Sequence, residues 1–326
     1  MSEKKSPQIV FCHVKDMDDF WLFLSKQSEG YLFRGHEKSS WRLQSGFERS
    51  REERMNFLTQ KHSLQQHNEW KSKNILIEKG YKIPKLKDEY YALDSYRHYA
   101  QIADKSMIEA AAMLQHYGGK TRLLDVTSSI LVALFFAFEN CNAEERAIWA
   151  FAESIFYSQS GIIDNWAVQN TPNEYDPLLC RYELLNNYNL RNAQCLEDAN
   201  KCFSKEDNTS GAENAKGIIP IRIAGNNSRL TAQNGAFLFP KTLHPFEENL
   251  LAALDINDAK LLQDGSQTFN SVAAYQSAYI SRPSIIKLIF PKYFYENAQL
   301  ILQQANISER SIYPDEIGLA KSIRYW

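Results

Sequence analysis

The stretch from Gln115 to Phe138, QHYGGKTRLLDVTSSILVALFFAF, constrains the fold most, because polar side chains lie directly beside the most apolar run of the chain. Gly118 and Gly119 predict the end of one helix, since glycine readily adopts the left-handed conformation that follows a last helical turn. Residues 121–127 predict a short buried strand. Residues 130–138 are apolar on every side and predict a helix at the centre of the core.

The polar groups of this stretch are expected to lie in or beside that core. Ser128 or Ser129 can cap the apolar helix by accepting a backbone N–H. Arg122, Asp125 and Thr127 precede it, and a buried charge without a partner is costly. Two interpretations stay open. Arg122 and Asp125 can form a structural ion pair, or the strand-to-helix junction can be the floor of a ligand site where helix N-terminal amides face an anion.

Composition sets the outer limits. The chain has 326 residues with 44% hydrophobic content, enough for a sizeable core, and its net charge of −2 argues against a general nucleic-acid binder, although a local basic groove stays open. The odd number of cysteines and the lack of a Cys-x-x-Cys pair favour a reducing, cytoplasmic compartment and argue against zinc. No apolar stretch reaches the ~20 residues that span a bilayer, so we expect no membrane partner. The cysteines are Cys12, Cys141, Cys180, Cys195 and Cys202.

Periodicity predicts an α+β fold, a modest mixed β-sheet heavily decorated with helices. Strands are expected at 31–33, 147–152, 218–223, 236–239 and 285–290, with a loop at 226–233 between the third and the fourth. The first should deliver Arg34, with Gly35 letting a ligand approach the backbone; a surface arginine before a glycine turn is the alternative. A helical arm is expected at about 46–117, including one long helix over 90–117, and a polar, mostly helical insertion at about 153–217, with a mobile region around 207–211.

Four ordered segments carry a resemblance to a known family. They are Phe33-Arg34-Gly35, the stretch 115–138, Arg229-Leu-Thr-Ala-Gln233-Asn-Gly235-Ala-Phe237 and Ser311-Ile-Tyr-Pro314-Asp315-Glu316-Ile-Gly318-Leu-Ala320. Together they resemble the FRG-domain proteins, a bacterial and phage family named for its Phe/Tyr-Arg-Gly motif. The match spans roughly residues 20–320, which implies a single FRG-type domain over 1–326. The chain departs from the family at Val126, where tryptophan is usual, and has Tyr313 as its closing aromatic residue.

The order of these groups also resembles the layout of ADP-ribosyltransferases. That resemblance implies NAD as the substrate, with Arg34 as its anchor and Thr127-Ser128 as the corner that supports the nicotinamide half. Gln233 stands where a late-strand glutamate is usual and cannot act as a carboxylate, so Asp125 and Glu316 are the candidate acids. The implied catalytic residues are Arg34, Asp125, Thr127 and Gln233. The implied NAD-binding residues are Phe33, Arg34, Gly35, His116, Tyr117, Arg122 and Ser128.

Three functional hypotheses follow. The first is a cytoplasmic ADP-ribosyltransferase-like toxin or phage-defence effector that acts on a nucleic acid, with mRNA among the candidates, or on a protein. The second is a non-catalytic module that senses a nucleotide or RNA through Arg34 and Asp125. The third makes the helical arm a binding surface for a partner such as an antitoxin protein. The chain has no Gly-x-Ser-x-Gly, Walker or Gly-x-Gly-x-x-Gly motif, which argues against hydrolase and ATPase functions.

Overall fold

The computed structural model describes residues 9–27, 30–63, 86–141, 144–157, 191–203, 216–223, 228–278 and 283–316. The middle of the expected helical arm, most of the expected insertion at 153–217 and the region around 207–211 lie outside these ranges. In the described part, residues 191–201 are helical.

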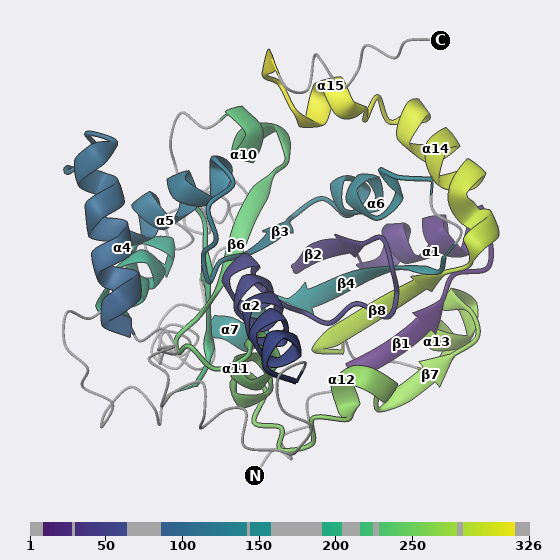
Figure 1. The fold of residues 1–326 in the computed structure, drawn as a ribbon. Coiled ribbons are helices and arrows are strands. Elements are labelled where there is room, and N and C mark those ends of the chain that lie inside the picture. The colour runs from purple at the N-terminus through teal and green to yellow at the C-terminus, as the bar shows by residue number, and fades with distance from the viewer. Residues whose placement is uncertain are drawn as a thin grey trace, which may run out of the picture.

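A mixed sheet forms the centre of the described structure (Figure 1). Its eight strands follow the order β5-β6-β3-β2-β4-β8-β1-β7 within the described ranges. Strand β1 pairs in parallel with β7 and β8, and the other neighbours are antiparallel. The strands are β1 (Ile9–His13), β2 (Tyr31–His36), β3 (Leu124–Thr127), β4 (Arg146–Ala152), β5 (Ile218–Ile221), β6 (Gly235–Pro240), β7 (Gln267–Phe269) and β8 (Ile285–Phe290).

Helices cover both faces of this sheet, because alternate residues of its buried strands point to opposite sides. One face packs against α1 (Met17–Gln27), α6 (Ile130–Phe138), α13 (Val272–Ala278) and α14 (Tyr295–Gln304), with the short α15 (Glu309–Ile312) beyond them. The opposite face packs against α7 (Ser154–Tyr157), α11 (Phe246–Ala253) and α12 (Leu261–Asp264). The 3₁₀ helix η2 (Lys292–Phe294) leads into α14.

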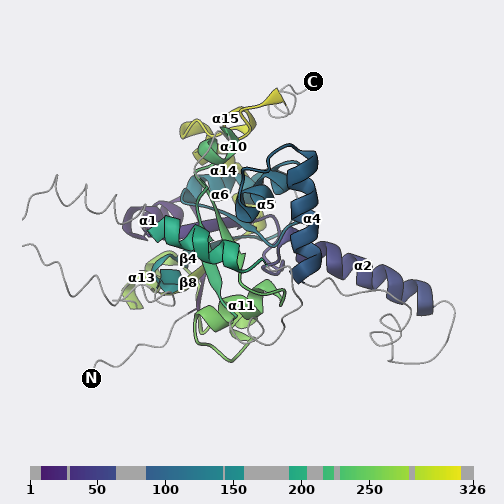
Figure 2. The same cartoon turned by 90° about the vertical axis from the view of Figure 1, so that its left-hand side faces the viewer.

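The β5–β6 end of the sheet has its own helical layer. There α4 (Leu86–Tyr99), α5 (Met107–His116) and residues 191–203 pack against the sheet, while α10 (Ser228–Ala232) precedes β6. Helix α2 (Gly46–Ser63) extends away from the body, as the side view shows (Figure 2). Helices α2, α4 and α5 occupy the range of the predicted arm.

The predicted central helix is confirmed as α6. Ser129 caps it by accepting the N–H of Val132 at 3.3 Å, and nearly all of its side chains are buried. Gly118 adopts a left-handed φ of 86° just past α5, as expected. The buried strand there is shorter than predicted and begins at Leu124.

Three other predictions are wrong. The single long helix over 90–117 is two helices, because Gln101 turns left-handed with a φ of 57° and Ser106 starts α5 with a capping box that includes Glu109. The loop expected before β6 contains α10. Arg34 lies inside β2 rather than at its end.

The fold is therefore a mixed α/β structure with a mixed sheet and helices on its faces, as the periodicity predicted. Among the described residues, no helix combines the length and apolar character needed to cross a membrane.

Candidate ligand-binding site

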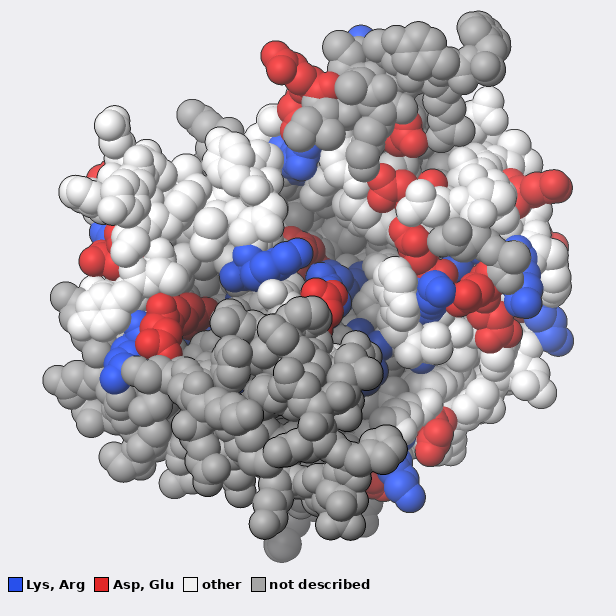
Figure 3. All heavy atoms as spheres, in the orientation of Figure 1, with Lys and Arg blue, Asp and Glu red and all other residues white. Residues whose placement is uncertain are grey.

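A cavity of about 320 Å³ opens where β2 and β3 separate. The two strands pair only at Phe33 and Thr127, whereas β2 pairs with β4 along its whole length. In the space-filling view, basic and acidic side chains are exposed together in the hollow at the centre of this face (Figure 3). The lining comprises Phe33, Arg34, Gly35, Glu37, Trp41, Asp125, Val126, Thr127, Phe136, Glu139 and Gln233.

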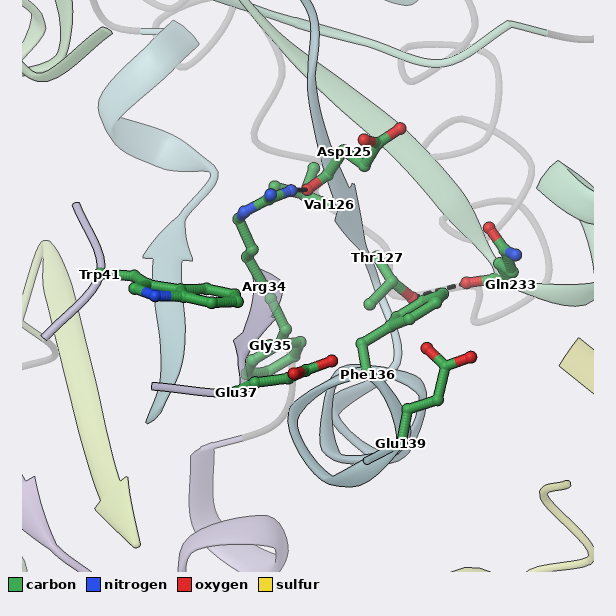
Figure 4. A pocket seen from close by; sticks show the side chains of 11 residues that line it. Arg34, Gly35, Glu37, Trp41, Asp125, Val126, Thr127, Phe136, Glu139 and Gln233 are labelled. Atoms are coloured by element: carbon green, nitrogen blue, oxygen red, sulfur yellow. Dashed lines mark hydrogen bonds between the residues drawn. The ribbon is translucent and has the colours of Figure 1, made fainter. Parts of the chain in front are cut away.

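The guanidinium of Arg34 bridges the diverging strands (Figure 4). Its Nη1 donates to the main-chain carbonyl of Asp125 at 2.6 Å, and its Nε donates to Nε2 of His36 at 3.2 Å. Burial lowers the pKa of Arg34 to about 10, an effect that the nearby Asp125 partly offsets. The group stays cationic at neutral pH, so the cavity has a fixed positive charge on one wall.

His36 and Trp41 support this arginine from the β2 side. His36 is 4% exposed, and burial together with the charge of Arg34 holds its pKa well below the ordinary value. A neutral imidazole can accept the Arg34 hydrogen bond, whereas an imidazolium cannot. The Trp41 ring packs edge-on to His36 at 6.1 Å and remains 46% exposed, so it offers a flat apolar surface to the cavity.

Four segments that are far apart in the sequence meet at this cavity. The Phe33-Arg34-Gly35 strand pairs with Thr127, whose hydroxyl donates to the main-chain carbonyl of Gln233 at 2.7 Å. The carboxamide of Gln233 donates to the carbonyl of Ile312 at 3.2 Å in the closing segment. The four segments that carry the family resemblance therefore form one spatial cluster.

An ion pair joins the last two of these segments. Arg229 Nε donates to a carboxylate oxygen of Asp315, and the Arg229 guanidinium lies 5.3 Å from the centre of the Tyr313 ring. These contacts hold the closing segment against the rim of the cavity.

Three carboxylates line the cavity beside the one guanidinium. Asp125 is exposed and accepts from the Gln115 carboxamide at 2.7 Å. Glu37 accepts from Asn140 at 2.7 Å. Glu139 accepts from the Tyr313 hydroxyl at 3.1 and 3.2 Å. Of the two acids proposed from the sequence, Asp125 lines the cavity and Glu316 does not.

Gly35 has a packing role that was not predicted from the sequence. A Cβ at this position would lie 2.1 Å from the carbonyl oxygen of Ala133 and 2.7 Å from the main-chain nitrogen of Ala137. Helix α6 therefore crosses β2 in backbone contact, which only glycine allows. The glycine lines the cavity, but the close approach that requires it is that of the helix.

Arg122 forms a structural ion pair, but with a different partner from the one expected. It is 2% exposed and pairs with Glu89, with Nε–Oε1 and Nη2–Oε2 distances of 2.9 and 2.7 Å, so the expected pair with Asp125 is wrong. Its Nη1 donates to the carbonyl of Pro240 at 3.0 Å, and its guanidinium lies 4.5 Å from the Phe239 ring centre. All of these partners lie away from the cavity, and the predicted NAD contact has no support in this arrangement.

The remaining predicted residues divide between the cavity and its surroundings. Phe33, Arg34, Gly35, Asp125, Thr127 and Gln233 line it, and they come from three of the four segments that carry the family resemblance. Ser128 adjoins it and bonds to the carbonyl of Asn234. His116 and Tyr117 end α5, pack ring to ring at 5.0 Å and do not line the cavity.

Five lining residues were not predicted as site residues from the sequence: Glu37, Trp41, Val126, Phe136 and Glu139. Glu37 and Trp41 follow Arg34-Gly35 closely in the sequence, and this proximity could have indicated that they line the same site. Phe136 lies on the apolar helix and Glu139 directly after it. The local sequence pattern there does not distinguish a residue that lines a cavity from one that packs in the core. Among the described residues, no group of three His, Cys, Asp or Glu side chains is arranged to hold a metal ion.

Residues 29–146 match the sequence model of the FRG domain. This range includes Arg34, Asp125, Thr127 and Glu139, but it ends before Gln233 and the closing segment. No curated protein matches the chain, and no solved structure does.

Proposed function

Because this chain carries an FRG domain at residues 29–146, whose arginine and strand-to-helix corner both line the cavity, we propose that it is an ADP-ribosyltransferase-like effector. It transfers ADP-ribose from NAD to a nucleic acid or a protein, as a toxin or a phage-defence protein in the cytoplasm. The likeness to the ADP-ribosyltransferase fold is part of the same proposal. The observation that carries the proposal is the convergence of Arg34, Thr127 and Gln233 on one cavity.

The chemistry of the lining supports a nucleotide ligand. A cationic guanidinium suits a pyrophosphate, and the faces of Trp41 and Phe136 suit a nicotinamide or adenine ring. In Figure 4 these two rings flank the Arg34 side chain. The volume of about 320 Å³ is at the lower end of ordinary ligand pockets, so it fits part of NAD, with the rest extending along the open hollow.

The carboxylates support glycosyl transfer over simple phosphate binding. Among the described lining residues, three carboxylates accompany one guanidinium, so their summed charge is negative. Negative charge stabilises the oxocarbenium-like state that forms when the bond between ribose and nicotinamide breaks. A site for inorganic phosphate alone would be weakened by the same groups.

The first test measures NAD cleavage and transfer. Purified protein is incubated with labelled NAD and cell lysate, and labelled products are digested separately with nuclease and protease. Arg34→Lys keeps the charge but loses the forked donor pair, so we expect on the order of 100-fold less label. Arg42→Lys is the matched control, because Arg42 is half exposed and pairs with Glu247 outside the cavity. The transfer proposal fails if the folded wild-type protein releases no nicotinamide and labels nothing.

One observation favours a second function, a non-catalytic sensing module for a nucleotide or RNA. The Thr127 hydroxyl and the Gln233 carboxamide nitrogen are both engaged in hydrogen bonds to main-chain carbonyls. Groups held in this way shape a binding site without supplying a reactive atom. Saturable NAD binding that depends on Arg34, without nicotinamide release, would support this second function.

The helical arm is the candidate surface for a protein partner such as an antitoxin. Helix α2 extends from the body (Figure 2), and among its described residues Glu52, Glu53 and Asn56 are exposed. Limited proteolysis with and without the product of a neighbouring gene tests this prediction, since an interface on the arm becomes protected on binding.

A further inference from the structure

Glu139 lies at a meeting point of two hollows. It is the first residue after α6 and lines the cavity that contains Arg34. It also lines a second hollow of about 380 Å³, bounded by α6, α14 and the start of α15. A side chain in this position can contact a ligand in the first cavity and a group that enters through the second.

The position of Glu139 is electrostatically unfavourable for a purely structural residue. The C-terminal end of a helix carries partial negative charge, so a carboxylate there is disfavoured unless another group compensates. One compensating group is the Tyr313 hydroxyl, which donates to the two Glu139 oxygens at 3.1 and 3.2 Å. The carboxylate is thereby fixed at the cavity wall.

Tyr313 is itself held from several sides. Its ring packs edge-on against Phe135 and Phe136, with centre distances of 6.1 and 6.3 Å. The Arg229 guanidinium covers the ring and is anchored by Asp315. Burial and the neighbouring Glu139 carboxylate raise the pKa of Tyr313 well above its usual range, so the hydroxyl keeps its proton and remains a donor.

We propose that Glu139 is the catalytic carboxylate of this site and that Tyr313 is its positioning residue. The inference rests on the proposed transfer of ADP-ribose from NAD. Glu139 supplies the carboxylate that Gln233, as an amide, cannot provide. The inference also explains the contact between the third and fourth segments that carry the family resemblance, because Arg229 and Asp315 hold the tyrosine that orients the carboxylate.

The step balances without any redox partner. The bond between ribose C1′ and the nicotinamide nitrogen breaks, and its electron pair leaves with neutral nicotinamide. The Glu139 carboxylate stabilises the positive charge left on the ribose. An acceptor O–H or N–H attacks C1′, and its proton passes to the Glu139 carboxylate and then to water. The sum is NAD⁺ and acceptor giving ADP-ribosyl acceptor, nicotinamide and one proton.

The geometry favours Glu139 over the other carboxylates of the cavity. Asp125 is exposed and lies beside the carbonyl that Arg34 binds, on the wall where the phosphates are expected. Glu37 lies on the loop after β2 and lines the first cavity but not the second hollow, whereas Glu139 lines both. In Figure 4 the Glu139 carboxylate points toward the space between Phe136 and Gln233.

Steady-state kinetics of nicotinamide release with the full-length chain test the assignment. We expect Glu139→Gln to lower kcat on the order of 100-fold while the KM for NAD and the melting temperature stay near wild type. Tyr313→Phe should lower kcat about ten-fold with an unchanged KM, because it removes only the charge-assisted hydrogen bond. Glu144→Gln and Tyr293→Phe are the matched controls and should behave as wild type, since neither residue is among those lining the two hollows.

The outcomes separate the two proposals. Wild-type protein that releases no nicotinamide overturns both of them. Active wild type with active Glu139→Gln overturns the assignment alone, as does a larger loss in Glu37→Gln than in Glu139→Gln. If Glu139→Gln melts early, Glu139→Asp replaces it, since the shorter side chain keeps the charge but withdraws it from the cavity. A Glu139→Asp enzyme with wild-type kcat would then count against the proposal.

Discussion

The contact between β2 and α6 gives the sharpest prediction, which concerns Gly35→Ala. The added Cβ would lie 2.1 Å from the carbonyl oxygen of Ala133, whereas ordinary contact begins at 3.4 Å, so the helix must retreat by about 1.3 Å (3.4 − 2.1). Overpacking costs about 1–3 kcal/mol, and we expect the upper end because main-chain atoms cannot rotate away. For a chain of this size, a loss of about 3 kcal/mol lowers the melting temperature by about 4 °C.

Differential scanning calorimetry measures this loss, and two further variants sharpen it. Gly46→Ala is the matched control, since its Cβ would make only an ordinary 3.6 Å contact with the Lys120 side chain. Ala133→Gly should not rescue Gly35→Ala, because the clash is with a carbonyl oxygen rather than a side chain. A Gly35→Ala protein with wild-type melting temperature but no ligand binding would refute the packing argument and return Gly35 to the role expected from the sequence.

Three further predictions concern stability. Glu89→Gln leaves the buried Arg122 guanidinium without its carboxylate and should lower the free energy of unfolding by about 3 kcal/mol with NAD binding unchanged; equal stability in urea unfolding would contradict this. Thr127→Val should lower the free energy of unfolding by about 2 kcal/mol. Thr127→Ser should lower it less, since serine keeps the hydroxyl that donates to the Gln233 carbonyl. A larger loss of stability in the serine variant than in the valine variant would exclude this explanation. Because the pKa of His36 is held well below 6.5, the unfolded chain binds a proton under pH 6.5 that the folded chain does not, so stability falls as pH falls below that value. In the His36→Gln variant, the melting temperature should depend less on pH below 6.5 than in the wild type. An unchanged pH dependence of the melting temperature would argue against a buried neutral imidazole.

Local patterns predicted the elements whose signal is concentrated in a few neighbouring residues. The apolar run at 130–138, its serine cap and the glycine at 118 each act within one turn of the chain, so α6 and the end of α5 were found. The break between α4 and α5 was not predicted, because Gln101 causes it by adopting a left-handed backbone conformation. Glutamine rarely adopts this conformation, so its presence in a sequence does not indicate a helix end. Strand β1 was not predicted, because the secondary structure of a lone apolar pentapeptide is ambiguous from its sequence. Only its pairing with β7 and β8 makes it a strand of the sheet.

The cavity was predicted in part. Arg34, Asp125, Thr127 and Gln233 were identified from the segments that carry the family resemblance, and all four line it. The face of the sheet to which the Arg122 side chain points was not predicted, because a residue in a buried segment can point to either face. Its partner Glu89 comes from α4, and only the packing of that helix on the β5–β6 end brings the two together.

The sequence by itself determined which segments matter, because hydrophobic period, glycine and capping residues act over short distances and because the four segments appear in order along the chain. Only the tertiary structure decided how they act. The separation of β2 from β3 opens the cavity, the backbone contact of α6 explains Gly35, and the closing segment brings Tyr313 to Glu139 across 174 positions. These are contacts between distant residues, and they depend on how whole strands and helices pack, which no local pattern encodes.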